Sequence, residues 1–413
     1  MERRLSPNVG AALIVTDGGG DQQKPVIWCN HDSMFSHRLA WNLRPNPIAG
    51  MLAAERRSGR GILDLTESNP TLAGFSYPAD EILSAFQNPR MLFYEPSPRG
   101  LRQAREAVAA AHGVEPDRIL LTTSTSESYA WLFKLLADPG DEILVPRPSY
   151  PLFEFLAGLE SVRVRQYPLA CHEGWWIDWA SLENQVTDRT RAILVVNPNN
   201  PTGSYLKRHE LDRLTALCAA RGLAIISDEV FADFAHASDE SRVTSLAGVT
   251  EALTFCLSGL SKVAALPQMK LGWIIAGGPG SHEAMERLEL IADTYLSVST
   301  PIQLAAPTLL DLRHELRKQI HRRVLDNLAF LRANHHPAHD LLEPEGGWYA
   351  VLRVPRTGSE QEWVMGLIER EGVLVQPGYF YDFDSEAWLI LSLLTHPNVF
   401  QEGARRIAAF SYN

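Results

Sequence analysis

Two titratable side chains in the middle of the chain follow hydrophobic runs and have types suited to chemistry on amines. Asp228 follows the apolar stretch 223–227, and Lys262 follows the stretch 253–257 after a few small residues. Burial disfavours the ammonium form of a lysine, and the neutral amine is then a nucleophile. A buried carboxylate in turn needs a cationic partner. Because an isolated lysine is usually a solvated surface residue, Lys262 becomes a candidate only in combination with other groups.

Two more loops that follow hydrophobic runs carry polar residues. Residues 124–126 read Ser-Thr-Ser and would open a helix whose free N–H groups and dipole can bind a phosphate. Residues 197–203 form a Pro- and Asn-rich turn that would hold the amide of Asn200 in a fixed direction. Alone, the first is a helix cap and the second a connection. With Asp228 and Lys262 they make a phosphate anchor, a ring-hydroxyl donor, a pyridinium partner and a Schiff-base lysine, which a pyridoxal phosphate site requires.

The elements that must position these groups alternate between two periodicities. Apolar runs predict strands over 119–123, 142–145, 162–167, 192–196, 223–227, 253–257 and 271–276, and helical patterns cover 127–137, 152–159 and 208–221. Strands separated by helices imply right-handed crossovers and a mostly parallel sheet with helices on both faces. The predicted fold class is therefore α/β, with ligands bound beyond the carboxyl ends of the strands.

The pattern changes after Pro301. A long helix is expected over 305–333, followed by strands over 348–354, 373–376 and 389–394 and helices over 362–370 and from Phe400. We expect a large cofactor domain over 66–300 and a smaller α+β domain over 301–413, which the N-terminal segment 34–65 joins. Residues 1–33 contain a glycine triplet and no periodicity, so we expect either a disordered extension or a start codon assigned too far upstream, with translation beginning at Met34.

Composition restricts the partners. The chain has 413 residues, 45% of them hydrophobic, and 38 basic against 49 acidic residues give a net charge of −11. A surface of that sign repels nucleic acid and anionic lipid. Four cysteines lie far apart without a CxxC pair, so neither a metal site nor a disulfide framework is expected. Since no apolar run is long enough for a membrane span or a signal peptide, a cytoplasmic protein is predicted.

Four sequence motifs carry a resemblance to a known family. They are Asn200-Pro201-Thr202-Gly203, Ser227-Asp228-Glu229-Val230, Ser258-Gly259-Leu260-Ser261-Lys262 and Lys270-Leu271-Gly272-Trp273. In order and separation they resemble the class I and II aminotransferases of fold type I, and the resemblance spans about Phe35 to the C-terminus. It implies a large domain with a mostly parallel central sheet, a smaller α+β domain, bound pyridoxal 5′-phosphate and a homodimer.

The resemblance also implies roles for individual residues. Lys262 resembles the lysine that forms the Schiff base with the cofactor and then moves the substrate Cα proton, and Asp228 resembles the carboxylate that keeps the pyridine nitrogen protonated. Asn200 corresponds to the residue that donates to the 3′ oxygen of the ring. Tyr150 resembles the aromatic residue stacked on the ring, although an aromatic side chain there is equally compatible with a core position.

Further residues match the family's phosphate and interface positions. Thr125 and Ser126, with Ser258 or Ser261 and with Lys270, would hold the phosphate.

Tyr94 resembles the tyrosine that reaches the phosphate of the neighbouring subunit. Asn69 resembles the Asn of an Asn-Pro segment that closes over the substrate, and Arg99 lies in a segment that borders the active site across the dimer. Asn69 and Arg99 are candidates for binding the substrate carboxylate.

The chain departs from the family pattern at three places. Lys270 stands where an Arg is usual, so the phosphate would meet a point charge instead of a bidentate fork. Phe231 replaces a Tyr that donates to the 3′ oxygen. The C-terminal strand segment 389–392 lacks the Arg that clamps the substrate carboxylate. Besides Asn69 and Arg99, Arg353 is a candidate for that role.

The sequence favours an aminotransferase that moves an amino group between an amino acid and a 2-oxo acid. A second interpretation keeps the cofactor and makes the chain a lyase, synthase or oxidase of secondary metabolism, because the usual carboxylate Arg is absent from segment 389–392. A third, a ligand-sensing regulator, would need an added DNA-binding domain, which the first 33 residues are too short to form.

Overall fold

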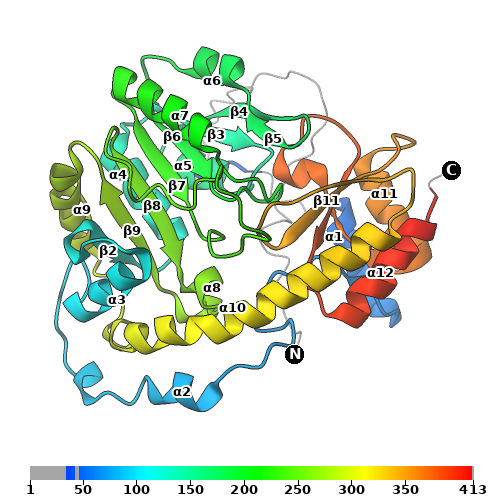
Figure 1. Cartoon of the computed structure of the whole chain (residues 1–413), viewed down its shortest axis with the longest axis horizontal. Helices are drawn as coiled ribbons and strands as arrows, with labels where there is room; N and C mark the ends of the chain where they lie inside the picture. The colour runs from blue at the N-terminus through cyan, green and yellow to red at the C-terminus, as the bar shows by residue number, and fades with distance from the viewer. Residues whose placement is uncertain (1–33, 42–45, 412–413) are drawn as a thin grey trace.

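The computed structural model describes residues 34–41 and 46–411 (Figure 1). The predicted extension over residues 1–33 lies outside these ranges. Two β-sheets of different size lie next to each other, and one long helix runs past both (Figure 1). The parallel strands of the larger sheet end near the junction of the two sheets, so that junction is where the predicted functional loops gather.

The larger sheet has eight strands in the order β2-β9-β8-β7-β6-β3-β4-β5. Their bounds are β2 Ile119–Thr122, β3 Glu142–Arg147, β4 Arg163–Cys171, β5 Trp175–Ile177, β6 Thr190–Val196, β7 Ala224–Asp228, β8 Thr254–Gly259 and β9 Gly272–Gly277. Strands β8, β7, β6, β3 and β4 run parallel to one another, whereas β9 is antiparallel to both β2 and β8. The predicted mostly parallel sheet is thus confirmed, with β9 and the edge strand β5 as the antiparallel exceptions.

Helices cover both faces of this sheet because its strands bury side chains in both directions. The helices are α2 Ala79–Ser84, α3 Arg102–His112, α4 Thr125–Leu136, α5 Phe153–Leu159, α6 Trp179–Gln185, α7 Arg208–Arg221, α8 Leu260–Val263 and α9 Ser281–Tyr295. Alternate strand residues pack against α3 and α7 on one face and against α4, α5 and α9 on the other. Within β7, Ile225 belongs to the first face and Ile226 to the second.

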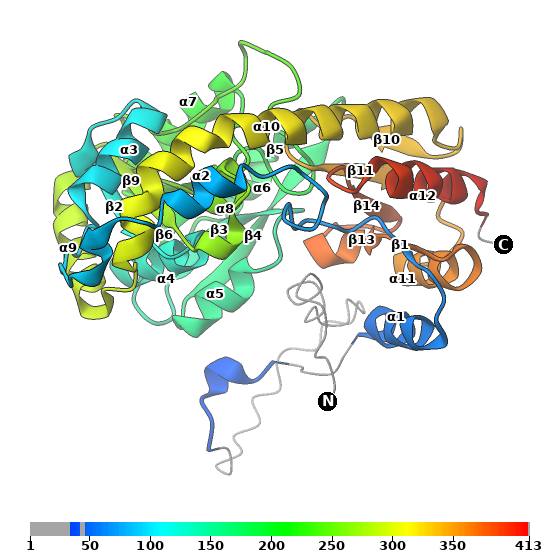
Figure 2. The same ribbon diagram turned by 90° about the horizontal axis from the view of Figure 1, so that it is seen from below.

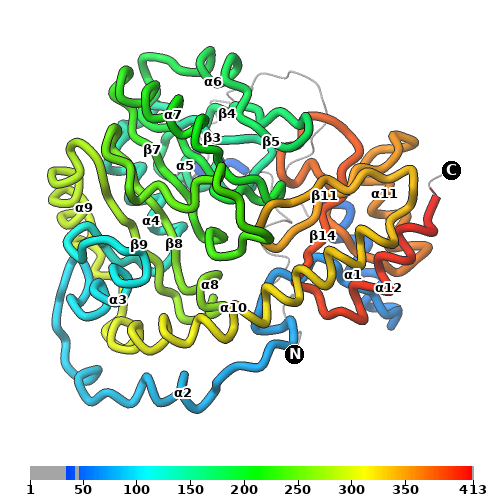
Figure 3. Tube along the Cα trace, viewed as in Figure 1, coloured from blue at the N-terminus to red at the C-terminus, as the bar shows by residue number. Residues whose placement is uncertain are grey.

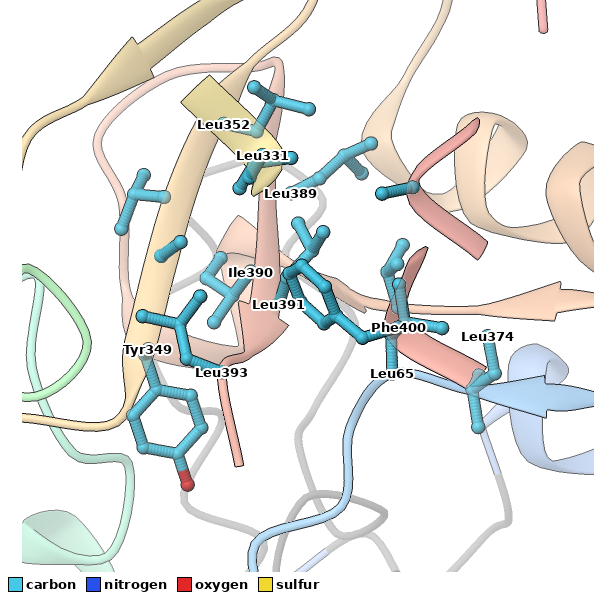
Figure 4. Close-up of a cluster of buried hydrophobic side chains, with 14 of the residues drawn as sticks. Leu65, Leu331, Tyr349, Leu352, Leu374, Leu389, Ile390, Leu391, Leu393 and Phe400 are labelled. Carbon is cyan, nitrogen blue, oxygen red and sulfur yellow. The ribbon is translucent and has the colours of Figure 1, made fainter. Parts of the chain in front are cut away.

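The smaller sheet has four antiparallel strands in the order β10-β11-β14-β13. Its strands and neighbours are β10 Asp340–Leu342, β11 Tyr349–Arg353, α11 Glu360–Gly366, β12 Val373–Leu374, β13 Gln376–Pro377, β14 Trp388–Ser392 and α12 Pro397–Ala409. From the N-terminal part, α1 (Pro47–Ser58) packs here, and β1 (Leu63–Asp64) pairs in parallel with β12. Leu65, Ile390 and Phe400 belong to the shared apolar core (Figure 4).

Helix α10 (Thr300–Asn334) connects the two sheets. Its 35 residues correspond to about 52 Å at 1.5 Å per residue. Leu309 and Leu310 in its first half pack on the larger sheet, whereas Ile320 and Val324 in its second half belong to the core of the smaller one. Figures 2 and 3 show the helix passing along both bodies. One continuous helix therefore sets the position of the smaller sheet relative to the larger one.

None of the helices in the described ranges combines the length and apolar character needed to cross a membrane.

Gly272 at the start of β9 is a close-contact position. An added Cβ would lie 2.9 Å from the Ser124 carbonyl carbon and 2.9 Å from Thr122 Oγ1. We expect Gly272→Ala to lower the free energy of unfolding by about 1–3 kcal/mol, because backbone must move to admit the methyl group. Urea denaturation measures this, with Gly248→Ala as the control, since nothing lies within 4 Å of a Cβ there. Equal stability of the two variants would refute the close contact.

Candidate active site

A cavity of about 410 Å³ lies between the carboxyl ends of the parallel strands and the smaller sheet. Its walls come from loops that follow β1, β2, β3, β6, β7 and β8 and from residues of the smaller sheet and its turns. The lining residues are Ser68, Asn69, Ser124, Thr125, Tyr150, Pro151, Val196, Asn200, Asp228, Val230, Phe231, Gly259, Ser261, Lys262, Pro267, Leu271, Tyr349, Gln376, Phe380 and Tyr381. The loops that sequence reasoning selected thus meet in one place.

Lys262 is the cation of this cavity wall. It lies in the short helix α8 directly after β8. Its Nζ is 4.9 Å from the ring centroid of Trp348 and 5.5 Å from that of Phe231, so aromatic faces surround it. Burial lowers the pKa of the amine to about 8, against a smaller opposing effect of Asp228. A substantial fraction of the side chain is therefore a neutral amine near pH 8, which is the nucleophilic form.

Asp228 is the buried carboxylate at the end of β7. Its Oδ2 accepts a hydrogen bond of 2.7 Å from the Tyr129 hydroxyl, and its Oδ1 accepts one of 3.1 Å from the Val230 amide. Burial raises the pKa of Asp228, and the two donors together with the Lys262 charge counteract that rise. These contacts orient the carboxylate and support its ionised form at the cavity wall.

Asn200 and Tyr150 reach the cavity from the loops after β6 and β3. The Asn200 Oδ1 atom is buried and has no hydrogen-bond partner among the described residues. A buried amide without a hydrogen bond costs free energy, so a ligand group that hydrogen-bonds to Asn200 would remove that cost. Tyr150 packs edge-on against Phe153 with ring centroids 6.1 Å apart, so it lines the cavity and contacts the core as well.

The N-terminus of α4 supplies free backbone N–H groups. Ser124 caps the helix, with its Oγ accepting from the Glu127 amide at 3.3 Å, and both Ser124 and Thr125 line the cavity. Helix α4 has 12 residues, so its dipole favours an anion at this end. Gly272 packs on the Ser124 backbone, which brings the segment that contains Lys270 beside this helix end.

Three predicted phosphate ligands are absent from the described cavity wall. Ser126 and Lys270 do not line it, whereas Ser261 does. Ser258 lines a different cavity. Because side chains alternate along β8, Gly259 is on the face with Asp228, and Ser258 points to the opposite face of the sheet.

The predicted substrate and interface residues fall into two groups. Asn69 lines the cavity, where its Oδ1 accepts from the Thr71 amide at 3.0 Å. Tyr94 is 78% exposed, and Arg99 pairs with Glu289 at 2.7 Å. Neither residue lines the cavity of its own chain. Arg353 pairs with Asp340 at the edge of the smaller sheet.

Sequence reasoning did not identify Tyr129, which lies behind the cavity wall and donates to Asp228, nor several residues of the wall itself. Tyr129 lies four residues after Thr125, so both lie on one helix face, and that spacing was a readable signal. Tyr349, Gln376 and Tyr381 come from the smaller sheet and its turns, and the Tyr381 hydroxyl donates to Gln376 Oε1. No local pattern indicates that they face Lys262.

The segment that lacks the expected arginine is part of the smaller sheet. Ile390 of β14 is fully buried and lies between Val351 and Gln376 in the sheet. Among the residues that the structure describes, no arginine lines the cavity. This face therefore presents amide and phenol groups.

Comparison with known proteins gives consistent matches. The family model for aminotransferase class I and II matches residues 60–407. The alanine aminotransferase of Mycobacterium tuberculosis is 28% identical over 369 residues, covering 84% of this chain and 85% of the relative. The glutamate-pyruvate aminotransferase AlaA of Haemophilus influenzae is 26% identical over 371 residues, covering 85% and 91%.

Solved structures share the fold. The alanine aminotransferase from Pyrococcus furiosus superimposes with a TM-score of 0.80 at 24% identity, covering 91% of this chain and 98% of that one. An Escherichia coli aminotransferase gives a TM-score of 0.78 at 24% identity, covering 88% and 94%. The expected fold type I architecture is confirmed.

The lowered pKa of Lys262 predicts a pH-dependent stability. Between about pH 8 and pH 10.5 the unfolded chain holds the proton that the native chain has released, so native stability rises with pH in this window. Lys262→Met removes this effect. We expect the stability difference between variant and wild type to change by roughly 3 kcal/mol in favour of the wild type from pH 8 to pH 10.5.

Urea denaturation of the cofactor-free protein at several pH values measures the difference. Lys318→Met, at an exposed position of α10, is the control for the removal of a lysine side chain. A pH-independent difference for Lys262→Met would contradict the lowered pKa.

Proposed function

Because the chain belongs to the aminotransferase class I and II family, we propose that it binds pyridoxal 5′-phosphate at Lys262 and transfers an amino group between an amino acid and a 2-oxo acid. The family match over residues 60–407 and the named relatives confirm the sequence-based expectation of an aminotransferase. The observation that carries the proposal for this site is the shared cavity of a buried lysine of lowered pKa and a buried, hydrogen-bonded aspartate.

The residues present fit this cofactor. The Oδ1 atom of Asn200 has no hydrogen-bond partner among the described residues, so nothing there fixes which way the amide is turned. With its NH2 group turned to the cofactor, the amide can donate to the ring's 3′ oxygen. Thr125 and the open end of α4 offer N–H groups to a phosphate. When bound, pyridoxal phosphate supplies a carbonyl that reacts with amines and a ring that withdraws electrons.

The protein side chains would divide the remaining work. Lys262 would accept and return the proton at the substrate Cα, since its pKa of about 8 is close to the working pH. Asp228 would face the pyridine nitrogen, where its charge favours the protonated ring. Tyr150 would pack on the ring face. Ser261, with Ser126 and Lys270, would complete the phosphate contacts.

We propose a homodimer for the assembled enzyme. Leu92, Phe93 and Tyr94 are three successive large side chains that are 83%, 71% and 78% exposed, and a partner subunit would cover them. In this arrangement Tyr94 and Arg99 would act at the partner's cavity instead of their own.

The thiols of Cys171, Cys218 and Cys256 are free, which supports a cytoplasmic location.

A second function, a lyase, synthase or oxidase on the same cofactor, is favoured by one observation. The buried strand segment 389–392 lacks the arginine that the family usually has there for the substrate carboxylate, and the described cavity wall offers amide and phenol groups instead. The absorbance of the bound cofactor during titration with an amino acid and then a 2-oxo acid separates the two reactions.

The Tyr129 hydroxyl is expected to support cofactor binding through Asp228. Tyr129→Phe removes the 2.7 Å bond, raises the pKa of Asp228 further and weakens its attraction for the protonated ring. We expect the Kd for pyridoxal phosphate to rise about tenfold or more, as for loss of a hydrogen bond to a charged group. Tyr167→Phe is the matched control, because that buried hydroxyl donates to the Leu194 carbonyl away from the cavity. Equal Kd values for both variants would exclude this role.

The reaction itself is tested by absorbance. Purified protein with pyridoxal phosphate is titrated with L-alanine, L-glutamate and other amino acids, and then with pyruvate or another 2-oxo acid. We expect the visible band of the lysine-bound cofactor to disappear with an amino donor and return with the 2-oxo acid. A band that never returns would favour the lyase or oxidase reaction.

Lys262→Ala is the control for the assigned lysine. It should bind cofactor without that visible band and without turnover. A variant that still cycles would remove Lys262 from its proposed role.

A further inference from the structure

A second cavity, of about 570 Å³, lies outside the proposed active site. Its walls come from the C-terminal end of α3, the loops after β7 and β8, and the middle of α10. Its polar lining includes His112, Asp233, Thr244, Arg313 and Arg317. The cofactor proposal uses none of these residues.

The strand ends separate this cavity from the proposed active site. Asp228 and Gly259 line the active-site cavity, whereas Glu229 and Ser258, the residues next to them in sequence, line the second one. Successive residues of an extended chain point to opposite faces of a sheet. The second cavity is therefore on the face that α3, α7 and the first half of α10 cover.

Helix α10 presents a row of basic side chains to this cavity. Arg313, Arg317 and His321 are spaced by four residues and so share one helix face, and Lys318 lies beside them. Arg317 pairs with Asp233 at 3.1 Å, and Lys318 pairs with Glu315 at 2.8 Å.

Arg313 has no carboxylate partner. Its Nη1 donates to the Leu310 carbonyl of its own helix, and no carboxylate of the described residues lies within ion-pair distance. Its guanidinium retains donors for an external acceptor, because one hydrogen bond uses one of its five N–H groups.

The acidic group on the opposite wall does not neutralise this cation. Glu229 is buried, and its oxygens accept from the Ser227 and Ser245 hydroxyls at 2.9 and 2.6 Å and from the Leu246 amide at 2.8 Å. These donors satisfy the carboxylate oxygens, so Glu229 is held in its own loop and does not pair with Arg313. Arg317 and Lys318 each pair with a carboxylate, so among the described residues of this wall the Arg313 guanidinium is the charged group that remains available to an anion.

Neutral groups in the wall are also unpaired. The Ser258 Oγ atom is buried without a hydrogen-bond partner among the described residues. The Nε2 atom of His112 accepts from the Trp273 indole at 3.1 Å, so the ring proton is on Nδ1 and Nδ1 is a donor. Ala111, Ala232 and Val263 add an apolar portion to the wall.

We propose that this second cavity binds a small organic anion, with a carboxylate or phosphate group on Arg313. Guanidinium donors match both groups, and the volume is within the range of small-molecule sites. The apolar wall would contact the carbon skeleton of the ligand. This site is additional to the proposed transamination and does not depend on it.

Isothermal titration of the pyridoxal phosphate-loaded enzyme tests the proposal, with citrate as the carboxylate probe and glycerol 2-phosphate as the phosphate probe. We expect at least one probe to bind, and Arg313→Gln to weaken it about tenfold to a hundredfold. Arg322→Gln is the matched control, since that side chain is on the same helix, is 86% exposed and pairs with Asp326. Binding that Arg313→Gln leaves unchanged, or no binding of either probe, would overturn the proposal.

A second measurement does not depend on a variant. Phenylglyoxal modifies free guanidinium groups, and mass spectrometry of the peptides reports each arginine separately. The bound probe should protect Arg313 and leave the modification of Arg322 unchanged. Equal modification of Arg313 with and without the probe would place any bound anion elsewhere, including the proposed active site.

Discussion

Burial of the Lys262 amine beside the Asp228 carboxylate is the constraint on which the proposed site depends. Removing either charge from water is costly, so the surroundings must offset that cost. Asp228 receives two hydrogen-bond donors, including the Tyr129 hydroxyl, while Lys262 lies against aromatic faces and titrates near pH 8. The same low-dielectric setting that makes the pair expensive also makes its electrostatic effect on a bound cofactor strong.

Because side chains alternate along β7 and β8, neighbouring residues at the ends of these strands line two different cavities. Asp228 and Gly259 turn to the face that α4 covers, and Glu229 and Ser258 turn to the other face. Neighbouring residues along one strand thus line the proposed cofactor site and the proposed anion site. The chain keeps the sites apart with one layer of backbone, whose N–H and C=O groups are already paired in the sheet.

Much of the fold and part of the site could be predicted from the sequence. Lys262, Asp228 and Asn200 follow apolar runs, and a parallel sheet brings the ends of such runs to one edge. The start of α4 was also readable from its hydroxyl residues. Tyr129 was missed although it is one helical turn from Thr125, and Ser258 was expected at the phosphate although its position in β8 directs it to the opposite face.

The sequence alone determined which residue types follow the strands, because they are read directly along the chain. It also determined the alternation of buried side chains, because that alternation follows from local strand geometry. The tertiary structure decided which side chains share a cavity. Tyr349 and Gln376 line the Lys262 cavity because α10, together with contacts such as the Lys207–Glu345 ion pair, holds the smaller sheet against the larger one. That contact depends on long-range packing between segments more than 80 residues apart in the chain, and no local pattern encodes it.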